Sequence, residues 1–275
     1  MNIFEKQNWI LLKGLVKTDF KLRYQGSFIG YLWSILKPIL LFIVMYAVFV
    51  KFLRLGEMVP HFAVALLLGI TLWNFFGEST GIGMTTIVSR GDLLRKISFP
   101  KPILIVAVVM NALINFGISL VVVLIFAIIN GVHFSWTIIA IIPLTVELVV
   151  FTLGVTLLLS TVYVYFRDLA PVWEVVMQAG FYATPIIYPI SQITTVMKGQ
   201  FGQIIARLVM LNPMAQIVQD FRYVLTYSNN MNPTAWQIYT HHWYFGFIPV
   251  ILSFLIFWLG LSVFNKRAKK FAEVV

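Results

Sequence analysis

The strongest constraint on the fold of this chain is the length of its segments without charge. Between Lys101 and Glu147, and again between Arg222 and Lys266, there is no aspartate, glutamate, lysine or arginine. Apolar residues make up 60% of the 275 residues and charged residues 11%, and the mean hydropathy is +0.91. One soluble core could not bury so much apolar surface, so the pattern predicts an all-α integral membrane protein.

Windows of about 20 apolar residues divide the chain into six predicted spans. These spans cover residues 30–52, 62–88, 103–129, 136–164, 173–188 and 245–264. We therefore expect three parts: an amphipathic interface helix in residues 1–29, a six-span domain in residues 30–265 and a basic tail in residues 266–275.

Lysine and arginine are distributed unevenly over the two sides that six spans would create. Fourteen of the 20 fall on the side of the two termini, five fall on the opposite side, and Lys37 lies inside the first span. The positive-inside rule then predicts that both termini are cytoplasmic. The net charge of +10 follows from this asymmetry and suits anionic lipid headgroups, so it requires no nucleic-acid partner.

A basic amphipathic segment precedes the first span. Lys13, Lys17 and Lys21 recur every four residues and would form one strip along a helix over residues 7–25. We expect this helix to lie in the cytoplasmic interface of the membrane. It is either an anchor, which is the simpler interpretation, or the lining of an entrance for an amphiphilic substrate. Both versions suit an aromatic belt formed by Tyr24, Tyr31 and Trp33.

The loop between the second and third spans, residues 89–102, has the pattern of a short basic helix. Asp92 is suited to cap its N-terminus, and Pro100 and Pro102 prevent its continuation. Three apolar residues fall on one side at helical spacing, namely Leu93, Leu94 and Ile97. The loop is either a docking element for a cytoplasmic partner or a polar turn that only satisfies the positive-inside rule.

The chain after the fifth span is predicted to be broken. Pro185 and Pro189 interrupt an apolar stretch, and each removes a backbone donor. Broken helix is tolerated at membrane depth where it is buried in protein or lines a wet cavity, so this segment is a candidate for the transport pathway. Asn212-Pro213 then opens a second short helix over residues 214–225. That helix is either an extracytoplasmic gate or an amphipathic helix on the outer leaflet.

Two carboxylates, Glu78 and Glu147, lie deep inside predicted spans and must face protein or water. From helical rise alone, Lys37 and Glu78 lie at similar depths and could form an ion pair. The alternative is that Glu78 or Glu147 carries protons in a proton-coupled carrier. Gly77, Gly81 and Gly83 would allow a close helix approach around Glu78.

Several chemistries have no support in the sequence. There is no cysteine, no recognisable metal spacing among the four histidines, and no G-x-x-x-x-G-K-[ST] phosphate loop. No nucleophile, base and orienting group come together outside the apolar spans. We therefore expect no catalytic residue, no metal site and no cofactor in this chain, and any ATP and magnesium to be bound by a partner.

The order of these features resembles the type-2 ABC exporter permeases of polysaccharides. The resemblance covers nearly the whole chain. Its motifs are the basic helix Arg90-Gly-Asp-Leu-Leu-Arg-Lys-Ile-Ser-Phe-Pro100, the Tyr165-Phe-Arg-Asp168 turn, Tyr188-Pro189 and Asn212-Pro213. Within that family the chain is most similar to the permeases of wall teichoic acid export, with the O-antigen permeases as siblings.

This resemblance implies a homodimer in the bacterial cytoplasmic membrane, with each copy docked on one copy of a separate ATPase subunit. The load would be an undecaprenyl-diphosphate-linked polymer that moves outward. The implied ATPase-coupling residues are Arg90, Asp92, Leu93, Leu94, Arg95, Lys96 and Phe99 in the first loop, with Arg167 and Asp168 after the fourth span. The implied extracellular gate contains Pro185, Tyr188, Pro189, Asn212, Pro213 and Arg222.

An anionic lipid diphosphate would be attracted by cations at the cytoplasmic entrance, and aromatic rings could stack on the sugars. The candidates for this entrance and lane are Lys13, Lys17, Lys21, Arg23, Lys37, Tyr24, Tyr31, Trp33 and Trp73. Three other functions stay open: a drug or small-lipid exporter of the same fold, a proton-coupled carrier that uses Glu78 or Glu147, and a membrane-embedded transferase.

Overall fold

The protein is described from a computed structural model that covers residues 5–24, 32–52, 61–197, 199–226, 233–239 and 243–274. Within these ranges the regular structure is helical and there is no β-strand. In chain order the elements are α1 (Lys6–Tyr24), α2 (Trp33–Met45), the π-helical η2 (Tyr46–Phe52), α3 (Phe62–Ser89), α4 (Gly91–Lys96), α5 (Pro102–Ile129), the 3₁₀ helix η4 (Trp136–Ala140), α6 (Ile141–Tyr165), α7 (Leu169–Ala183), α8 (Ile190–Val196), α9 (Gln200–Val209), α10 (Pro213–Thr226), α11 (Ala235–Ile238), the 3₁₀ helix η5 (Trp243–Gly246), α12 (Phe247–Ala268) and α13 (Phe271–Val274).

Four stretches of the described chain are long and apolar enough to cross a membrane. They are Phe62–Ser89, Pro102–Ile129, Trp136–Tyr165 and Tyr244–Ala268. Helices therefore stand where the second, third, fourth and sixth spans were predicted, and their bounds agree to within a few residues. The chain is a multi-pass membrane protein.

The first and fifth predicted spans have different bounds from those expected. In the first, α2 passes into η2, and its apolar part, Leu36–Phe49, is short. In the fifth, α7 has 15 residues, or about 22 Å of helix against a hydrocarbon core of about 30 Å. The prediction that this helix reaches residue 188 was wrong, because Thr184 is already extended ahead of Pro185. The count of six spans stays a prediction.

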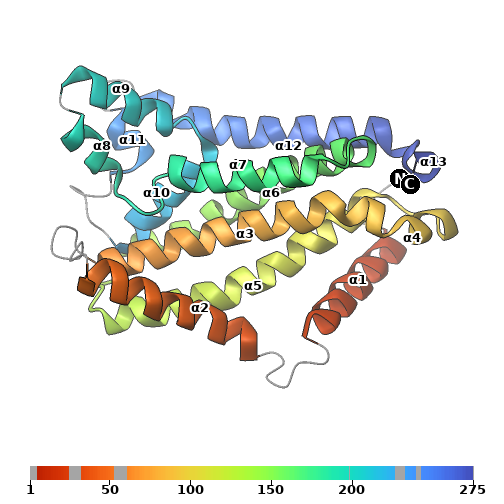
Figure 1. Cartoon of the computed structure of the whole chain (residues 1–275), viewed down its shortest axis with the longest axis horizontal. Helices are drawn as coiled ribbons and strands as arrows, with labels where there is room; N and C mark the ends of the chain where they lie inside the picture. The colour runs from red at the N-terminus through yellow and green to blue at the C-terminus, as the bar shows by residue number, and fades with distance from the viewer. Residues whose placement is uncertain are drawn as a thin grey trace.

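Helix α3 lies in the middle of the bundle, with α2 and α5 on one side and α7 and α12 on the other (Figure 1). Of its most apolar window, 78% is buried, which is more than in the other three candidate spans. It also carries buried hydroxyl groups that donate to carbonyls of the preceding turn, such as Thr71 to Leu67 and Thr80 to Phe76. A central position therefore explains why α3 is the least hydropathic of these helices.

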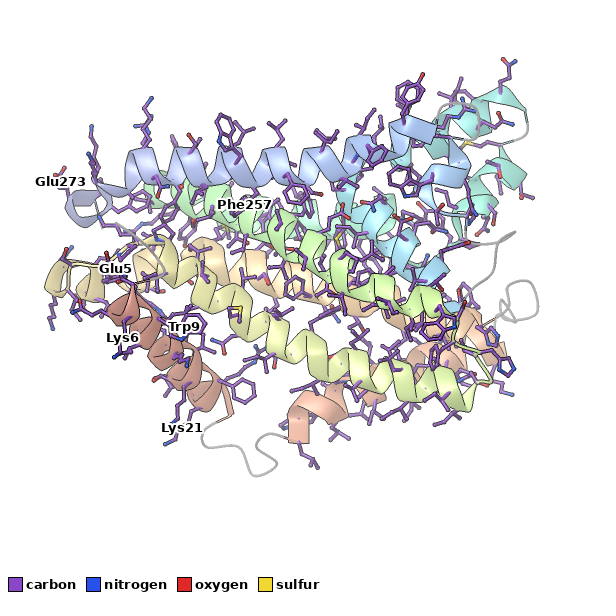
Figure 2. All side chains as sticks on the ribbon, turned by 180° about the vertical axis from the view of Figure 1, so that it is seen from behind. Glu5, Lys6, Trp9, Lys21, Phe257 and Glu273 are labelled. Atoms are coloured by element: carbon purple, nitrogen blue, oxygen red, sulfur yellow. The ribbon has the colours of Figure 1, made fainter. Side chains whose placement is uncertain are left out.

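Helices α6 and α12 make a close crossing at two glycines. A Cβ atom on Gly154 would lie 2.6 Å from the backbone of Phe257, and one on Gly260 would lie 2.4 Å from the carbonyl oxygen of Gly154. Figure 2 shows Phe257 on α12 at its crossing with α6. Of the glycines predicted to allow close approach around Glu78, Gly83 meets Thr156 of α6 and Gly77 meets Met177 of α7, whereas Gly81 has no neighbour within 4 Å.

One hydrophobic cluster joins the two ends of the chain to the loop between α3 and α5. Its buried members include Leu12 of α1, Leu94 of α4, Phe99, Phe264 of α12 and Phe271 of α13. Glu5 and Glu273 accordingly lie at the same end of the molecule (Figure 2). We call this end, with α4, the turn at residues 166–168 and α13, the docking end, after the partner contact that the sequence predicts for α4 and for this turn.

The opposite end carries the short helices α8 to α11, together with the start of α3 (Figure 1). The predicted break is confirmed: α7 ends at Ala183, and α8 begins at Ile190, directly after Pro189. Helices α9 and α10 meet at 98°, which is the geometry of a broken span or a re-entrant loop. Because almost every residue of α10 is buried, the alternative of a helix lying on the outer leaflet is wrong.

Candidate functional site

A cavity of about 650 Å³ lies between the end of α1 and helices α2, α3, α5 and α7. Among the described residues that line it, the charged ones are Arg23, Lys37 and Glu78. Polar lining comes from Thr71, Asn74, Asn115 and Ser119, and aromatic lining from Trp33, Trp73, Phe75 and Phe116. The cavity therefore combines a net positive charge with apolar, ring-bearing walls, which suits an amphiphilic anion.

Glu78 forms an ion pair with Arg23, the penultimate residue of α1. Its carboxylate also accepts a hydrogen bond from Nδ2 of Asn115 at 3.0 Å. The expectation that Glu78 pairs with Lys37 was wrong, although both residues line the cavity. Helical rise places two residues at one depth, but it does not say which faces of their helices meet.

Four of the predicted entrance and lane residues come together in this cavity: Arg23, Trp33, Lys37 and Trp73. Trp73 also packs on Phe76 and Phe181, with ring centroids 5.8 and 6.1 Å away, so it supports the wall as well as lining it. Tyr31 lies outside the described residues, and Tyr24 is described only as the last residue of α1.

The basic strip of α1 lies outside the cavity. Lys13, Lys17 and Lys21 are exposed, and Nζ of Lys13 lies 5.2 Å from the centre of the Trp9 ring. Figure 2 shows Lys6, Trp9 and Lys21 spaced along this helix. The opposite side of α1 packs through Leu12 into the cluster of the docking end. The helix thus presents positive charge on one side and is fixed to the bundle on the other.

A second ion pair attaches α1 to the loop before α4. Nη2 of Arg90 donates to both carboxylate oxygens of Asp19, at 2.7 and 2.6 Å. Sequence reasoning missed this contact, although Asp19 is the one acidic residue in α1 and could have been assigned an arginine partner. Arg90 is therefore engaged within this chain and does not face a docking partner alone.

The predicted coupling residues of α4 and of the segment that follows it divide into two sets. Leu94 and Phe99 are each 7% exposed and belong to the cluster of the docking end, with Leu93 packed against it. Asp92, Arg95 and Lys96 are exposed, as are Arg167 and Asp168 in the turn between α6 and α7. Asp92 lies in the first turn of α4 but is not its N-cap, because Arg90 holds that position.

Lys101, near the end of this loop, connects the start of α5 to the C-terminal end. Its ammonium group donates to the carbonyl oxygen of Ala268 and lies 5.8 Å from the centre of the Phe271 ring. Burial lowers the pKa of Lys101, and the nearby carboxylate of Glu273 opposes this shift. The docking end is thus held by polar contacts as well as by its apolar cluster.

At the opposite end, Arg222 of α10 binds the broken segment. Its side chain is 2% exposed, and its guanidinium donates to the carbonyl oxygens of Pro185, Ile186 and, at 3.5 Å, Tyr188. Its Nε also donates to the carbonyl oxygen of Ala65 in α3, at 3.0 Å. One side chain therefore satisfies the backbone that the prolines leave without helical partners.

The remaining predicted gate residues lie at the start of α10 and in the broken segment. Oδ1 of Asn212 accepts a hydrogen bond from the backbone N–H of Met214 at 3.0 Å and so caps α10, which begins at Pro213. The hydroxyl of Tyr188 donates to the carbonyl oxygen of Tyr182 at 3.1 Å, across the break. Of the predicted gate residues, the structure thus brings Arg222 to Pro185 and Tyr188, whereas Asn212 and Pro213 lie at the start of α10.

Glu147 faces protein, as its position in a span required. It is 7% exposed and accepts hydrogen bonds of 3.5 Å from Gln216 of α10 and Ser253 of α12. Gln216 also donates to Asp220 at 2.7 Å, so one amide group bridges two buried carboxylates. Among the residues described here, no group of three or more histidine, cysteine, aspartate or glutamate side chains could hold a metal ion.

Residues 10–226 match the ABC-2 type transporter family. The chain belongs to this family. Two relatives of this ABC-2 transporter are O-antigen export system permease proteins RfbA, from Myxococcus xanthus and from Klebsiella pneumoniae. Each is 30% identical to it over 96% of this chain and 95% of the relative, and a second Klebsiella pneumoniae protein of the same name is 28% identical. Membership implies a separate ATPase partner, because these relatives are permease subunits.

Proposed function

We propose that this chain is the membrane subunit of an ATP-driven exporter that moves a polysaccharide, carried on a lipid diphosphate, outward across the bacterial cytoplasmic membrane. The cavity at the end of α1 carries this proposal, since it places Arg23 and Lys37 beside aromatic walls. Arginine and lysine suit a diphosphate, and the rings suit the apolar faces of sugars. The exposed lysines of α1 would attract the anionic headgroup from the membrane surface.

The transported polymer is of the O-antigen type in this proposal. The relatives that match this chain over nearly their whole length are named O-antigen export permeases. Wall teichoic acid, which the resemblance of the sequence motifs favoured, is the second candidate. Complementation distinguishes the two candidates. Expressed together, this chain and its ATPase subunit would restore O-antigen display in a strain that lacks its O-antigen permease, or teichoic acid display in a strain that lacks its teichoic acid permease.

The working unit in this proposal is a homodimer with two copies of a separate ATPase subunit, which binds the ATP and magnesium. Both termini and the docking end would face the cytoplasm. The exposed charges of α4 and of the turn at Arg167 and Asp168 support this assignment, because they are available to a partner surface. ATP-driven closure of the partner would displace α4 and change the arrangement of the spans.

We predict that the double substitution Arg95→Glu and Lys96→Glu abolishes co-purification with the ATPase subunit of the exporter, co-expressed from the same organism. Both side chains are exposed on α4, so their reversal changes the surface and leaves the fold intact. The measurements are complex recovery from detergent and lipid-stimulated ATPase activity. Leu94 is unsuitable for this test, because it is buried in the chain's own cluster.

The matched control is Lys269→Glu with Lys270→Glu, which reverses two exposed charges at the same end of the molecule. It should leave the complex intact. If the wild-type chain associates with no ATPase, the exporter proposal fails, and proton-linked transport through Glu78 or Glu147 becomes the leading account.

A further inference from the structure

The ion pair between Arg23 and Glu78 lies in the wall of the cavity that the proposed substrate would use. Arg23 comes from the end of α1 and Glu78 from the middle of α3, and both are lining residues. Their side chains are 39% and 22% exposed, so the pair is accessible to a solute that enters the cavity. Arg23, a cation at the entrance, is thus already paired with a carboxylate of the protein itself.

A guanidinium group binds a carboxylate and a phosphate with the same N–H donors. A diphosphate that approaches Arg23 therefore competes directly with Glu78. Replacement leaves Glu78 with a hydrogen bond, because Nδ2 of Asn115 in α5 donates to the same carboxylate. Lys37 also lines the cavity and offers a second positive charge to the incoming group. The exchange therefore leaves neither anion without a donor or counter-charge.

Helix α1 does not depend on this pair alone for its position. Arg90 holds Asp19 at 2.6 and 2.7 Å, and Leu12 is buried in the cluster of the docking end. Arg23 can therefore change partners while the body of α1 stays attached. An ion pair that served only to fix α1 would duplicate these contacts.

We propose that Glu78 is an internal competitor that occupies Arg23 until the diphosphate of a lipid-linked polymer replaces it. This inference rests on the function proposed above. The pair selects ligands by charge, since a ligand must attract Arg23 more strongly than the carboxylate of Glu78 does. A lipid diphosphate meets this condition, whereas a headgroup with one phosphate carries less charge.

The test measures binding of tritiated farnesyl diphosphate to the full chain in nanodiscs of phosphatidylcholine. Glu78→Gln removes the competing charge and keeps an acceptor for Asn115, so it should tighten binding by about fivefold, the range of a partly exposed ion pair. Arg23→Gln should weaken binding at least as much. Asp19→Asn is the matched control: it breaks the other ion pair of α1, outside the cavity, and should leave the affinity within about twofold of wild type.

Two sources of anionic headgroup are separated by competition. Unlabelled farnesyl diphosphate should displace the probe, and phosphatidylglycerol added to the nanodiscs should displace it poorly. Equal displacement by both would overturn the proposal, because the site would then recognise any anionic lipid.

Affinity that is unchanged in Glu78→Gln, or weakened together with that of Asp19→Asn, would also overturn it, since the pair would then only position α1. Failure of all variants to bind the probe would do the same. None of these results measures association with the ATPase or polymer export in cells, and those two measurements judge the proposed function separately. Melting temperatures of the variants show that each is folded, and Arg23→Gln supplies a second measurement if Glu78→Gln is not.

Discussion

Arg222 shows how one residue can replace the hydrogen bonds of a missing helical turn. Prolines 185 and 189 stop the helix, and the carbonyl oxygens exposed by this break would be costly in an apolar surrounding. The guanidinium offers five donors in a fixed plane, which a lysine could not match. Its contacts to Ala65, Pro185 and Ile186 thereby connect α3 and α10 to the broken segment.

We expect Arg222→Gln to loosen this end of the molecule. Several buried carbonyl groups would lose their donors, at a cost of about 1–3 kcal/mol for each group left unpaired. Hydrogen exchange should then rise in residues 184–190, and the melting temperature should fall. Arg207→Gln is the control, because Arg207 of α9 contributes its backbone carbonyl, rather than its side chain, to the hydrogen bond with Tyr239. Unchanged exchange in Arg222→Gln would show that the broken segment is held by other contacts.

At the scale of elements, the crossing of α6 and α12 depends on the absence of side chains. Helices inside a membrane gain little from apolar burial against each other and rely on close packing, which small residues allow. Gly154 and Gly260 place the two backbones closer than any Cβ would permit. Ser253 and Glu147 lie on the same two helices, so the crossing also positions a buried polar contact.

Gly154→Ala should therefore separate α6 from α12 and destabilise the protein by about 1–3 kcal/mol, as overpacked cores do. The measurement is thermal unfolding in detergent, monitored by intrinsic fluorescence. Gly117→Ala in α5 is the matched control, because a Cβ there meets no atom within 4 Å. That change should be neutral or stabilising, since alanine is the better helix former. Equal losses in both variants would argue against a special role for the crossing.

At the scale of the whole molecule, the docking end joins segments from the beginning, middle and end of the chain. Phe271 of the short helix α13 is fully buried with Phe99 and Leu94, although it lies only a few residues from the C-terminus. The surface proposed to contact the ATPase therefore packs on buried residues that the partner would not touch.

We predict that Phe271→Ala lowers the melting temperature, by the equivalent of about 3–5 kcal/mol, and weakens association with the ATPase. The cavity left by the ring would withdraw support from α4. Val274→Ala, at an exposed position of the same helix, should change neither property. The measurements are thermal unfolding and recovery of the complex. If Phe271→Ala is destabilised but still binds the ATPase normally, the cluster is not needed for association.

The sequence predicted the features that depend on composition along the chain and missed those that depend on how helices face each other. Hydropathy located the long helices, and Pro185 marked the break, because both are local properties. The partner of Glu78 was assigned wrongly, since depth in the membrane carries no information about rotation around a helix axis. The contacts of Arg222 could not be predicted, because its acceptors are backbone carbonyls of an irregular segment.

The two ion pairs of α1 have a mechanical consequence. Asp19 and Arg23 stand one helical turn apart, about 6 Å along the axis, and they fasten α1 to the start of α4 and to the middle of α3. A short rigid helix that is attached at two such points transmits a displacement from one attachment point to the other. We therefore expect a push on the loop before α4 to reach the cavity wall at Arg23 through α1, without first passing along the length of the bundle.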